Sequence, residues 1–158
     1  MKLSVVCANG KAGQKIVEEA LGRGLDVTAV VRGENRSAAT QVVQKDLFDL
    51  TPQDLAGYDV VVDAFGAWTE DTLPLAQAQG KALEALRTRN DVQWTFLSPA
   101  ADFQPEGART GKYILAGEEF TCNAKGESVI SYADYAIALV DEAVSGAHPQ
   151  ARISVVGE

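Results

Sequence analysis

The sequence contains few of the residues that metal centres and disulfide frameworks require. Its 158 residues include two cysteines, Cys7 and Cys122, and one histidine, His148. The cysteines lie far apart and neither belongs to a Cys-x-x-Cys pair, so we expect no metal site and no structural disulfide. Long apolar runs are also missing. Nowhere do about 18 apolar residues follow one another, and the first apolar run is too short for a signal peptide, so we expect a cytoplasmic protein without a membrane anchor.

Basic residues are outnumbered by acidic ones. The chain has 14 Lys and Arg against 22 Asp and Glu, a formal net charge of -8. The nearest approach to a basic patch is the scattered set Arg32, Arg36 and Lys45. A field of this sign repels nucleic acid and anionic lipid, so we expect a small-molecule acceptor as partner and neither nucleic acid nor membrane. The 46% hydrophobic and 23% charged residues are ordinary for one domain, which we place at residues 1–158.

Short apolar runs alternate with segments of helical periodicity along most of the chain. Buried-strand patterns occur at residues 3–8 and 27–31, and further strands are expected at residues 41–45, 58–65, 93–97 and 152–156. Helical patterns occur at residues 11–21, 75–87 and 132–144, with a helical turn at 51–55. Further short strands are expected at residues 113–115, 119–122 and 128–130. The alternation predicts a Rossmann-type α/β fold, with a doubly wound, mostly parallel sheet and helices on both faces.

The loop after the first predicted strand contains two glycines, Gly10 and Gly13. It opens the first predicted helix, whose first-turn N–H groups and positive dipole end attract anions. A glycine pair alone is weak evidence, because a tight turn without a ligand has the same pattern. Here it follows a buried strand and lies inside a βαβ unit, which is the setting of a dinucleotide phosphate loop.

Arg32 directly follows the second predicted strand. In NAD-binding proteins an acidic residue near this point accepts the ribose hydroxyls, whereas a guanidinium suits the 2′-phosphate of NADP. The position therefore favours NADP(H) over NAD(H). The alternative is that Arg32 is an ordinary solvated loop residue.

Four segments of the chain match a known family. They are Lys2-Leu3-Ser4-Val5-Val6 leading into Asn9-Gly10-Lys11-Ala12-Gly13, then Trp94-Thr95-Phe96-Leu97-Ser98-Pro99-Ala100, Arg109-Thr110-Gly111-Lys112-Tyr113, and Gly126-Glu127-Ser128-Val129-Ile130-Ser131 with Asp134-Tyr135-Ala136. With these segments the sequence resembles the NmrA-like, atypical short-chain dehydrogenase/reductases, in particular the small proteins assigned as NADH-flavin reductases. The resemblance covers nearly the whole chain.

The resemblance implies where each part of a dinucleotide lies. The pyrophosphate lies on the glycine loop, formed by Asn9, Gly10, Lys11, Ala12 and Gly13. Arg32 reaches the adenosine end, and adenine is flanked by Asp46 and Leu47. The nicotinamide end is lined by Phe65, Gly66, Ala67, Ser98 and Pro99.

Cys7 departs from the family pattern GxxGxxG, because it stands where the first glycine allows the strand to turn tightly. This departure puts cofactor affinity in question. The plainer interpretation of the side chain is a buried, inert thiol. The alternative is a reactive thiol whose pKa is lowered by the nearby helix N-terminus.

The chain is also shorter than the family pattern. Family members have another helix, a glycine-rich fifth strand and a loop between the fourth strand and the helix at 75–87, whereas here Leu73 runs straight into Pro74 and Leu75. Either the protein has lost a central strand, or its chain carries residues here that the sequence does not include. We favour the second, because losing an interior strand removes ladder partners from two neighbours. A measured intact mass of 16.8 kDa would exclude it.

The proton donor of the classical short-chain dehydrogenases is missing. That mechanism needs a Tyr-x-x-x-Lys pair, and none of the four tyrosines is followed by lysine at this spacing. Reduction of a flavin or quinone needs less, because the nicotinamide passes hydride directly to a planar acceptor stacked on it. We therefore expect an NAD(P)H-dependent reductase of a flavin, quinone or similar acceptor, with no catalytic side chain assigned.

Two other functions fit the same residues. One is a non-catalytic NADP-binding redox sensor of NmrA type, and the other is a Rossmann scaffold that has lost its cofactor. In the reductase hypothesis, four aromatic residues are candidates for the walls of the acceptor site, although they could equally pack in the core: Phe65, Trp68, Phe103 and Tyr113.

Overall fold

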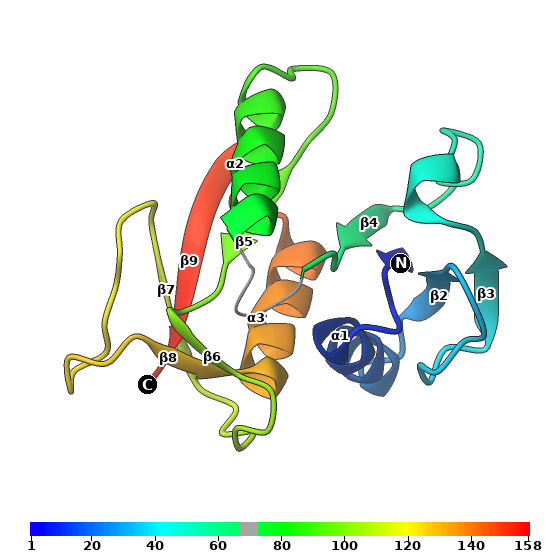
Figure 1. Cartoon of the computed structure of the whole chain (residues 1–158). Coiled ribbons are helices and arrows are strands. Elements are labelled where there is room, and N and C mark those ends of the chain that lie inside the picture. The colour runs from blue at the N-terminus through cyan, green and yellow to red at the C-terminus, as the bar shows by residue number, and fades with distance from the viewer. Residues whose placement is uncertain (67–72) are drawn as a thin grey trace.

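The computed structural model describes residues 1–66 and 73–158, which form an α/β fold of mainly parallel strands (Figure 1). The N-terminal part contains β1 (Lys2–Val6), α1 (Lys11–Gly22), β2 (Asp26–Val31), β3 (Gln41–Gln44), the 3-10 helix η1 (Leu47–Asp49) and β4 (Val60–Asp63). The rest contains α2 (Leu73–Arg87), β5 (Thr95–Ser98), β6 (Asp102–Gln104), β7 (Tyr113–Ala116), β8 (Val129–Ser131), α3 (Tyr132–Ser145) and β9 (Ala151–Gly157). The predicted fold class is confirmed.

The first sheet has the strand order β3-β2-β1-β4, and all neighbouring strands are parallel. β1 and β2 are buried along their whole length apart from their first residues. This burial explains their continuous apolar sequences, because a central parallel strand is covered on both faces. α1 covers one face of the sheet with the buried residues Ile16, Val17 and Ala20.

The C-terminal strands form two smaller sheets. In the first, β9 lies between β5, to which it is parallel, and β7, to which it is antiparallel. In the second, β6 pairs with β8 in parallel. Ile130 of β8 and Val155 and Val156 of β9 are buried in the core that these strands share with α3.

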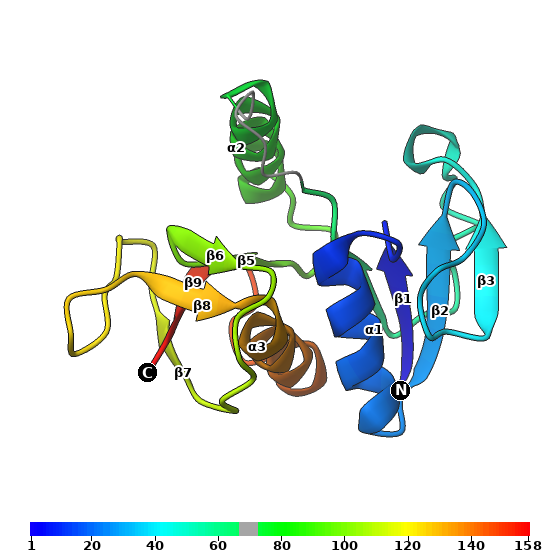
Figure 2. The same cartoon turned by 60° about the horizontal axis from the view of Figure 1, so that its bottom comes forward.

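Helix α3 joins the two parts of the molecule. Its Ala136 and Val140 belong to the core beneath the first sheet, and its Ala138 belongs to the C-terminal core. Tyr135 packs against both cores and donates a hydrogen bond from its hydroxyl to the carbonyl of Leu97 in β5 at 2.9 Å. Figure 2 shows α1 and α3 next to one another between the strands of the two parts.

The sheets are not continuous between β4 and β5. Within the described residues, β4 pairs only with β1 and β5 pairs only with β9. Val61 of β4 is 42% exposed. Strands β4 and β5, which do not pair with one another, flank the segment whose length departs from the family pattern.

Helix α2 stands apart from the three sheets (Figure 2). Residues Ala78 and Ala82, which the helical pattern places on the inner face, are exposed; Leu83 is buried and Leu86 is half-buried. The side chain of the fifth such residue, Leu75, lies outside the description. The expectation for Ala78 and Ala82 is wrong, because the helix has no sheet surface beneath most of its length.

Several other details differ from the sequence prediction. Residues 119–122 form no strand, and Phe120 is 74% exposed with no apolar surface to cover it. The sequence pattern around Phe103, with Pro105 and two glycines following, predicts a polar loop, yet Phe103 lies in β6 and its ring packs on Tyr132. The helical pattern places Val144 of α3 on the inner face, but Val144 is 49% exposed. No helix of residues 1–66 and 73–158 combines the length and hydropathy needed to cross a membrane.

Candidate functional site

The carboxyl ends of β1, β2, β3 and β4 meet at one edge of the first sheet, because these strands are parallel. The loops that leave this edge are residues 7–10, 32–40, 45–46 and 64–66. They contain or adjoin those predicted cofactor-binding residues of the N-terminal part that the structure describes. These residues therefore lie along one edge of the first sheet.

Helix α1 begins at this edge without a side-chain cap. Its N-cap residue is Gly10, and neither a capping side chain nor an acidic residue occurs in its first turn. The N–H of Gly10 donates to the carbonyl of Cys7 at 3.0 Å, and the N–H of Gln14 donates to the carbonyl of Gly10 at 2.9 Å. The intervening first-turn N–H groups are thus directed toward solvent beyond the helix, where an anion can accept from them.

Gly13 allows α1 to lie directly against the end of β1. A Cβ atom at this position would lie 2.6 Å from the carbonyl oxygen of Cys7 and 2.9 Å from the Cα of Ala8. Both neighbours are backbone atoms, which cannot move aside without shifting the strand or the helix. This strand–loop–helix geometry therefore requires glycine at position 13. An anion site at this helix end depends on the same geometry.

Cys7 adopts a left-handed backbone conformation, with φ of 60°. This conformation favours glycine, because the Cβ of other residues approaches the following carbonyl group. The structure thus explains why the family pattern has glycine here. Burial and the nearby Asp63 raise the pKa of the Cys7 thiol, and Arg32 only partly opposes them. The expectation of a thiol activated by the helix N-terminus is not supported by this shift.

We expect Cys7→Gly to stabilise the protein. Removing the Cβ from a left-handed residue should raise the free energy of unfolding by about 1 kcal/mol, net of the entropy that glycine adds to the unfolded chain. Urea denaturation followed by circular dichroism measures the change. Cys122→Gly is the control, because Cys122 is exposed and lacks a positive φ. An equal or lower stability of Cys7→Gly would contradict the interpretation of strain.

The adenosine side of the site contains Arg32, Asp46 and Leu47. Arg32 is exposed, and within residues 1–66 and 73–158 its side chain makes no hydrogen bond or ion pair. Asp46 caps η1 by accepting the N–H of Phe48 at 3.0 Å, and Leu47 is half-buried. The caps and the strand ends fix the backbone here, while the Arg32 guanidinium stays available to a ligand.

The predicted nicotinamide side is only partly brought together. Phe65 and Gly66 follow β4, and Phe65 is 45% exposed at the same edge as the glycine loop. Ser98 is the last residue of β5, in the three-stranded sheet, and Pro99 follows it; the Ser98 hydroxyl accepts a hydrogen bond from Arg152 at 3.0 Å. Ala67 and Trp68 lie outside the described residues. The break between β4 and β5 thus runs through this side of the predicted site.

Two of the four candidate aromatic walls pack in the core. The ring of Phe103 lies 4.0 Å from that of Tyr132 and 4.9 Å from that of Tyr135, measured between centroids. Tyr113 packs against the same core and donates its hydroxyl to Asp141. Core packing is therefore the role of Phe103 and Tyr113, whereas Phe65 remains exposed at the site.

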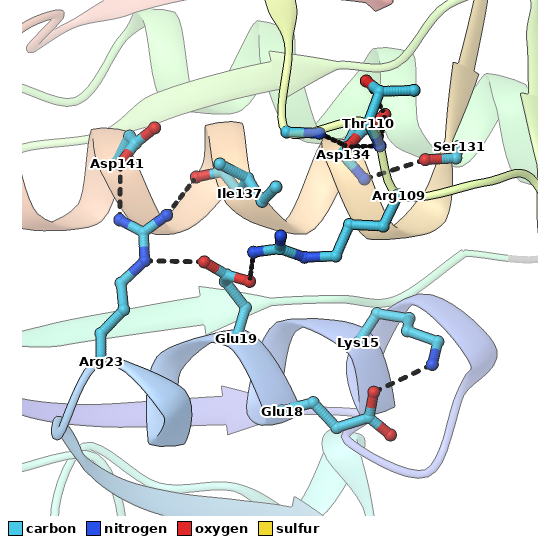
Figure 3. Close-up of polar contacts among 11 residues, drawn as sticks. Lys15, Glu18, Glu19, Arg23, Arg109, Thr110, Ser131, Asp134, Ile137 and Asp141 are labelled. Atoms are coloured by element: carbon cyan, nitrogen blue, oxygen red, sulfur yellow. Dashed lines mark hydrogen bonds and ion pairs between the residues drawn. The ribbon is translucent and has the colours of Figure 1, made fainter.

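A polar network, not foreseen from the sequence, ties α1 to α3 and to residues 109–111 (Figure 3). Glu19 of α1 accepts from Arg109 and from Arg23, each at 2.8 Å, and Arg23 also contacts Asp141 of α3. Burial raises the pKa of Glu19, but hydrogen bonds from Arg109 and Arg23 outweigh it and lower the pKa overall. The segment at 109–113 was singled out only by family resemblance, and no local pattern predicts its partners in α1.

A cleft of about 680 Å³ lies beside this network. It is lined by α1 and by the loop around Gly107, and charged side chains of both signs face it, among them Lys15, Glu18 and Arg109. It does not include the glycine loop. The mixed charges match no single ligand, so the sheet edge stays the candidate site.

No family model matches the chain. YwnB of Bacillus subtilis, an uncharacterized protein, is 35% identical over 211 aligned residues, which span all of this chain and 99% of YwnB. Because the chain itself has 158 residues, YwnB contains internal residues that have no counterpart here.

Two solved structures resemble the chain along its length. SP1627 of Streptococcus pneumoniae, named for a proposed NADH-flavin reductase activity, is 45% identical with a TM-score of 0.93, and both chains are covered completely. Lmo0794 of Listeria monocytogenes is 30% identical with a TM-score of 0.70, covering 99% of this chain and 100% of its own. The chain therefore belongs to the family of YwnB and SP1627, the NADH-flavin reductase group of the NmrA-like, atypical short-chain dehydrogenase/reductases.

Proposed function

We propose that the protein is an NAD(P)H-dependent oxidoreductase that prefers NADPH and reduces a flavin, a quinone or a similar planar acceptor. The observation that carries the proposal is the close contact of α1 with the end of β1. Glycine at position 13 permits this contact, because a Cβ atom there would lie 2.6 Å from the carbonyl oxygen of Cys7. This contact leaves an uncapped helix N-terminus at the carboxyl edge of a parallel sheet, where dinucleotide phosphates bind. The name of SP1627 supports the choice of a flavin.

The residues present fit a dinucleotide in three respects. The first turn of α1 offers backbone N–H groups to a pyrophosphate, and no carboxylate stands in that turn. Arg32 offers a guanidinium at the end of β2 that has no hydrogen-bonding or ionic partner among residues 1–66 and 73–158, and a guanidinium matches the charge and geometry of a 2′-phosphate. Phe65 offers an exposed ring at the end of β4. A bound dinucleotide would supply hydride from its nicotinamide, and these residues would bind and orient the dinucleotide.

Tyr113 and Tyr135 are poorly suited to be the acid of an alcohol dehydrogenase. Burial, together with the hydrogen bond to Asp141, raises the pKa of Tyr113 to about 12. Burial also raises the pKa of Tyr135, whose hydroxyl is engaged with Leu97. Neither group can give up a proton readily near neutral pH. An acceptor that takes hydride without a tyrosine proton donor suits this site better than a ketone does.

Two measurements test the proposal. Calorimetric titration with NADPH and with NADH shows whether the glycine loop binds a dinucleotide despite Cys7. Steady-state oxidation of NADPH with free flavin or a soluble quinone, against a blank without protein, then shows whether hydride is transferred. Turnover above the blank is the expected result. Tight binding without turnover would favour the redox-sensor alternative, and absence of binding would indicate a scaffold that has lost its cofactor.

We expect Arg32→Asp to reverse the cofactor preference. Loss of a charge-assisted hydrogen bond is worth about 1.5–3 kcal/mol, so NADPH affinity should fall roughly 10- to 100-fold while NADH affinity stays the same or rises. Calorimetry with both cofactors measures this. Lys125→Asp changes the net charge equally in a remote loop and should leave both affinities nearly unchanged. An equal fall for both cofactors in Arg32→Asp would contradict recognition of the 2′-phosphate.

A further inference from the structure

The side chain of Asn9 links the glycine loop to the loop after β2. Its amide nitrogen donates to the carbonyl of Glu34 at 2.8 Å, and its amide oxygen accepts the backbone N–H of Arg36 at 2.7 Å. The two contacts use both ends of the amide at once. A carboxylate could not donate to Glu34, and a hydroxyl is too short and has only one polar atom to make both contacts. The side chain of Asn9 is thus directed at residues 34–36.

The backbone of Asn9 is held from the other side. Gln14, one turn into α1, donates from its side-chain amide to the carbonyl of Asn9 at 2.9 Å. The position of Asn9 is thereby fixed relative to the helix end where a pyrophosphate would bind. A displacement of the loop after β2 would therefore break contacts to a residue that the helix holds in place.

The loop after β2 is ordered internally by a second asparagine, Asn35. Its side-chain oxygen accepts the N–H of Ser37 at 3.0 Å, and its nitrogen donates to the carbonyl of Ala39 at 2.8 Å. The loop therefore has a defined shape of its own, and the Asn9 amide attaches that shape to the glycine loop. Fixed loops of this kind reduce the ordering cost of binding.

Two arginines project from this attached loop. Arg32 and Arg36 are both exposed, and within the described parts of the chain neither guanidinium has a hydrogen-bonding or ionic partner. Glu34 supplies the only carboxylate between them in sequence. A doubly charged phosphate on the ribose would meet two cations here, whereas a ribose hydroxyl would gain little from either of them.

We infer that Asn9 is a positioning residue for cofactor selection: its amide holds the loop bearing Arg32 and Arg36 at a fixed place relative to the pyrophosphate. The inference rests on the proposed dinucleotide function. On that function, Arg32 and Arg36 would contact the 2′-phosphate, and Asn9 would act through them. Its removal would therefore weaken NADPH binding selectively, because NADH lacks the phosphate group that the two guanidinium groups would bind.

The experiment is calorimetric titration of Asn9→Ala with NADPH and NADH, beside a matched amide deletion elsewhere. Asn123 is buried and organises a distant turn by accepting the N–H groups of Lys125 at 3.0 Å and Glu127 at 3.1 Å. We expect Asn9→Ala to lower NADPH affinity about 10-fold and NADH affinity less than about 3-fold. Asn123→Ala should lower the melting temperature but leave the ratio of the two affinities unchanged.

A double-mutant cycle separates positioning from general damage. In a chain carrying Arg32→Ala and Arg36→Ala, the further change Asn9→Ala should alter NADPH affinity by less than about 3-fold, because no guanidinium is left to position. Hydrogen exchange of the Arg36 amide should accelerate in Asn9→Ala without any cofactor present. An unchanged affinity ratio, or an equal loss in the two backgrounds, would overturn the inference. Absence of dinucleotide binding to the unmodified protein would instead refute the proposed function.

Discussion

The Gly13→Ala variant should lose measurable dinucleotide binding and about 3 kcal/mol of its free energy of unfolding. The added Cβ would overlap the carbonyl oxygen of Cys7 and the Cα of Ala8, at 2.6 and 2.9 Å. Overpacking against side chains costs about 1–3 kcal/mol, and the upper end applies because backbone atoms cannot change rotamer. To relieve the overlap, α1 must move away from β1, which displaces the first-turn N–H groups from the place where a pyrophosphate would lie.

Urea denaturation and calorimetric titration with NADPH measure the two losses in Gly13→Ala. Gly80→Ala is the matched control, since Gly80 lies inside α2 and a Cβ there would meet no atom within 4 Å. That variant should gain up to about 1 kcal/mol from helix propensity and should bind as the parent does. Gly13→Ala with parental affinity for NADPH would show that the pyrophosphate does not use this helix end.

The Asp134→Ala variant should lose about 3–5 kcal/mol of stability, the largest effect of any single side chain considered. The carboxylate is 2% exposed and accepts the N–H groups of Thr110 and Gly111, both at 2.9 Å, together with the Thr110 hydroxyl at 2.8 Å. Its removal takes the acceptor from two backbone N–H groups, leaves the Thr110 hydroxyl only the Lys112 carbonyl at 3.3 Å, and takes a negative charge from the first turn of α3. Figure 3 shows this carboxylate between α3 and the loop that carries Arg109.

Thermal unfolding measures the loss in Asp134→Ala. Asp49→Ala removes an exposed carboxylate from η1 and should change stability by no more than about 0.5 kcal/mol. Ser131→Ala tests the same helix end separately, because the Ser131 hydroxyl accepts the N–H of Asp134 at 3.0 Å; a loss of about 1 kcal/mol is expected. If Asp134→Ala were as stable as Asp49→Ala, the loop at 109–111 would not depend on this carboxylate.

The N-terminal half of the fold could be predicted from the sequence because its signals are local. Continuous apolar runs marked β1 and β2, the helical period of Ile16 and Val17 marked α1, and the glycines marked the loop between them. The family pattern also pointed to Cys7 as the residue at the tight turn, and the structure gives that residue a φ of 60°. Each of these features depends on a few neighbouring residues and on backbone sterics.

The features that could not be predicted depend on residues far apart in the chain. Asn9 was expected at the pyrophosphate, and nothing in its neighbourhood indicates that its side chain bonds to residues 25 and 27 positions away. Phe103 lies in a strand because of rings that come from α3. Predicting that Ser98 and Pro99 would join the same site required a continuous sheet, and the described strands β4 and β5 do not pair.

The position of α3 in the sequence has a consequence for synthesis of the protein on the ribosome. Ala136 and Val140 complete the core beneath the first sheet, yet they are translated more than seventy residues after β4, which ends at Asp63. At 5–20 residues per second, the nascent sheet would wait roughly 4–15 s for this wall of its core. During that interval the side of α1 that packs against α3 has no partner, so the newly made N-terminal half exposes an apolar surface that a chaperone can bind.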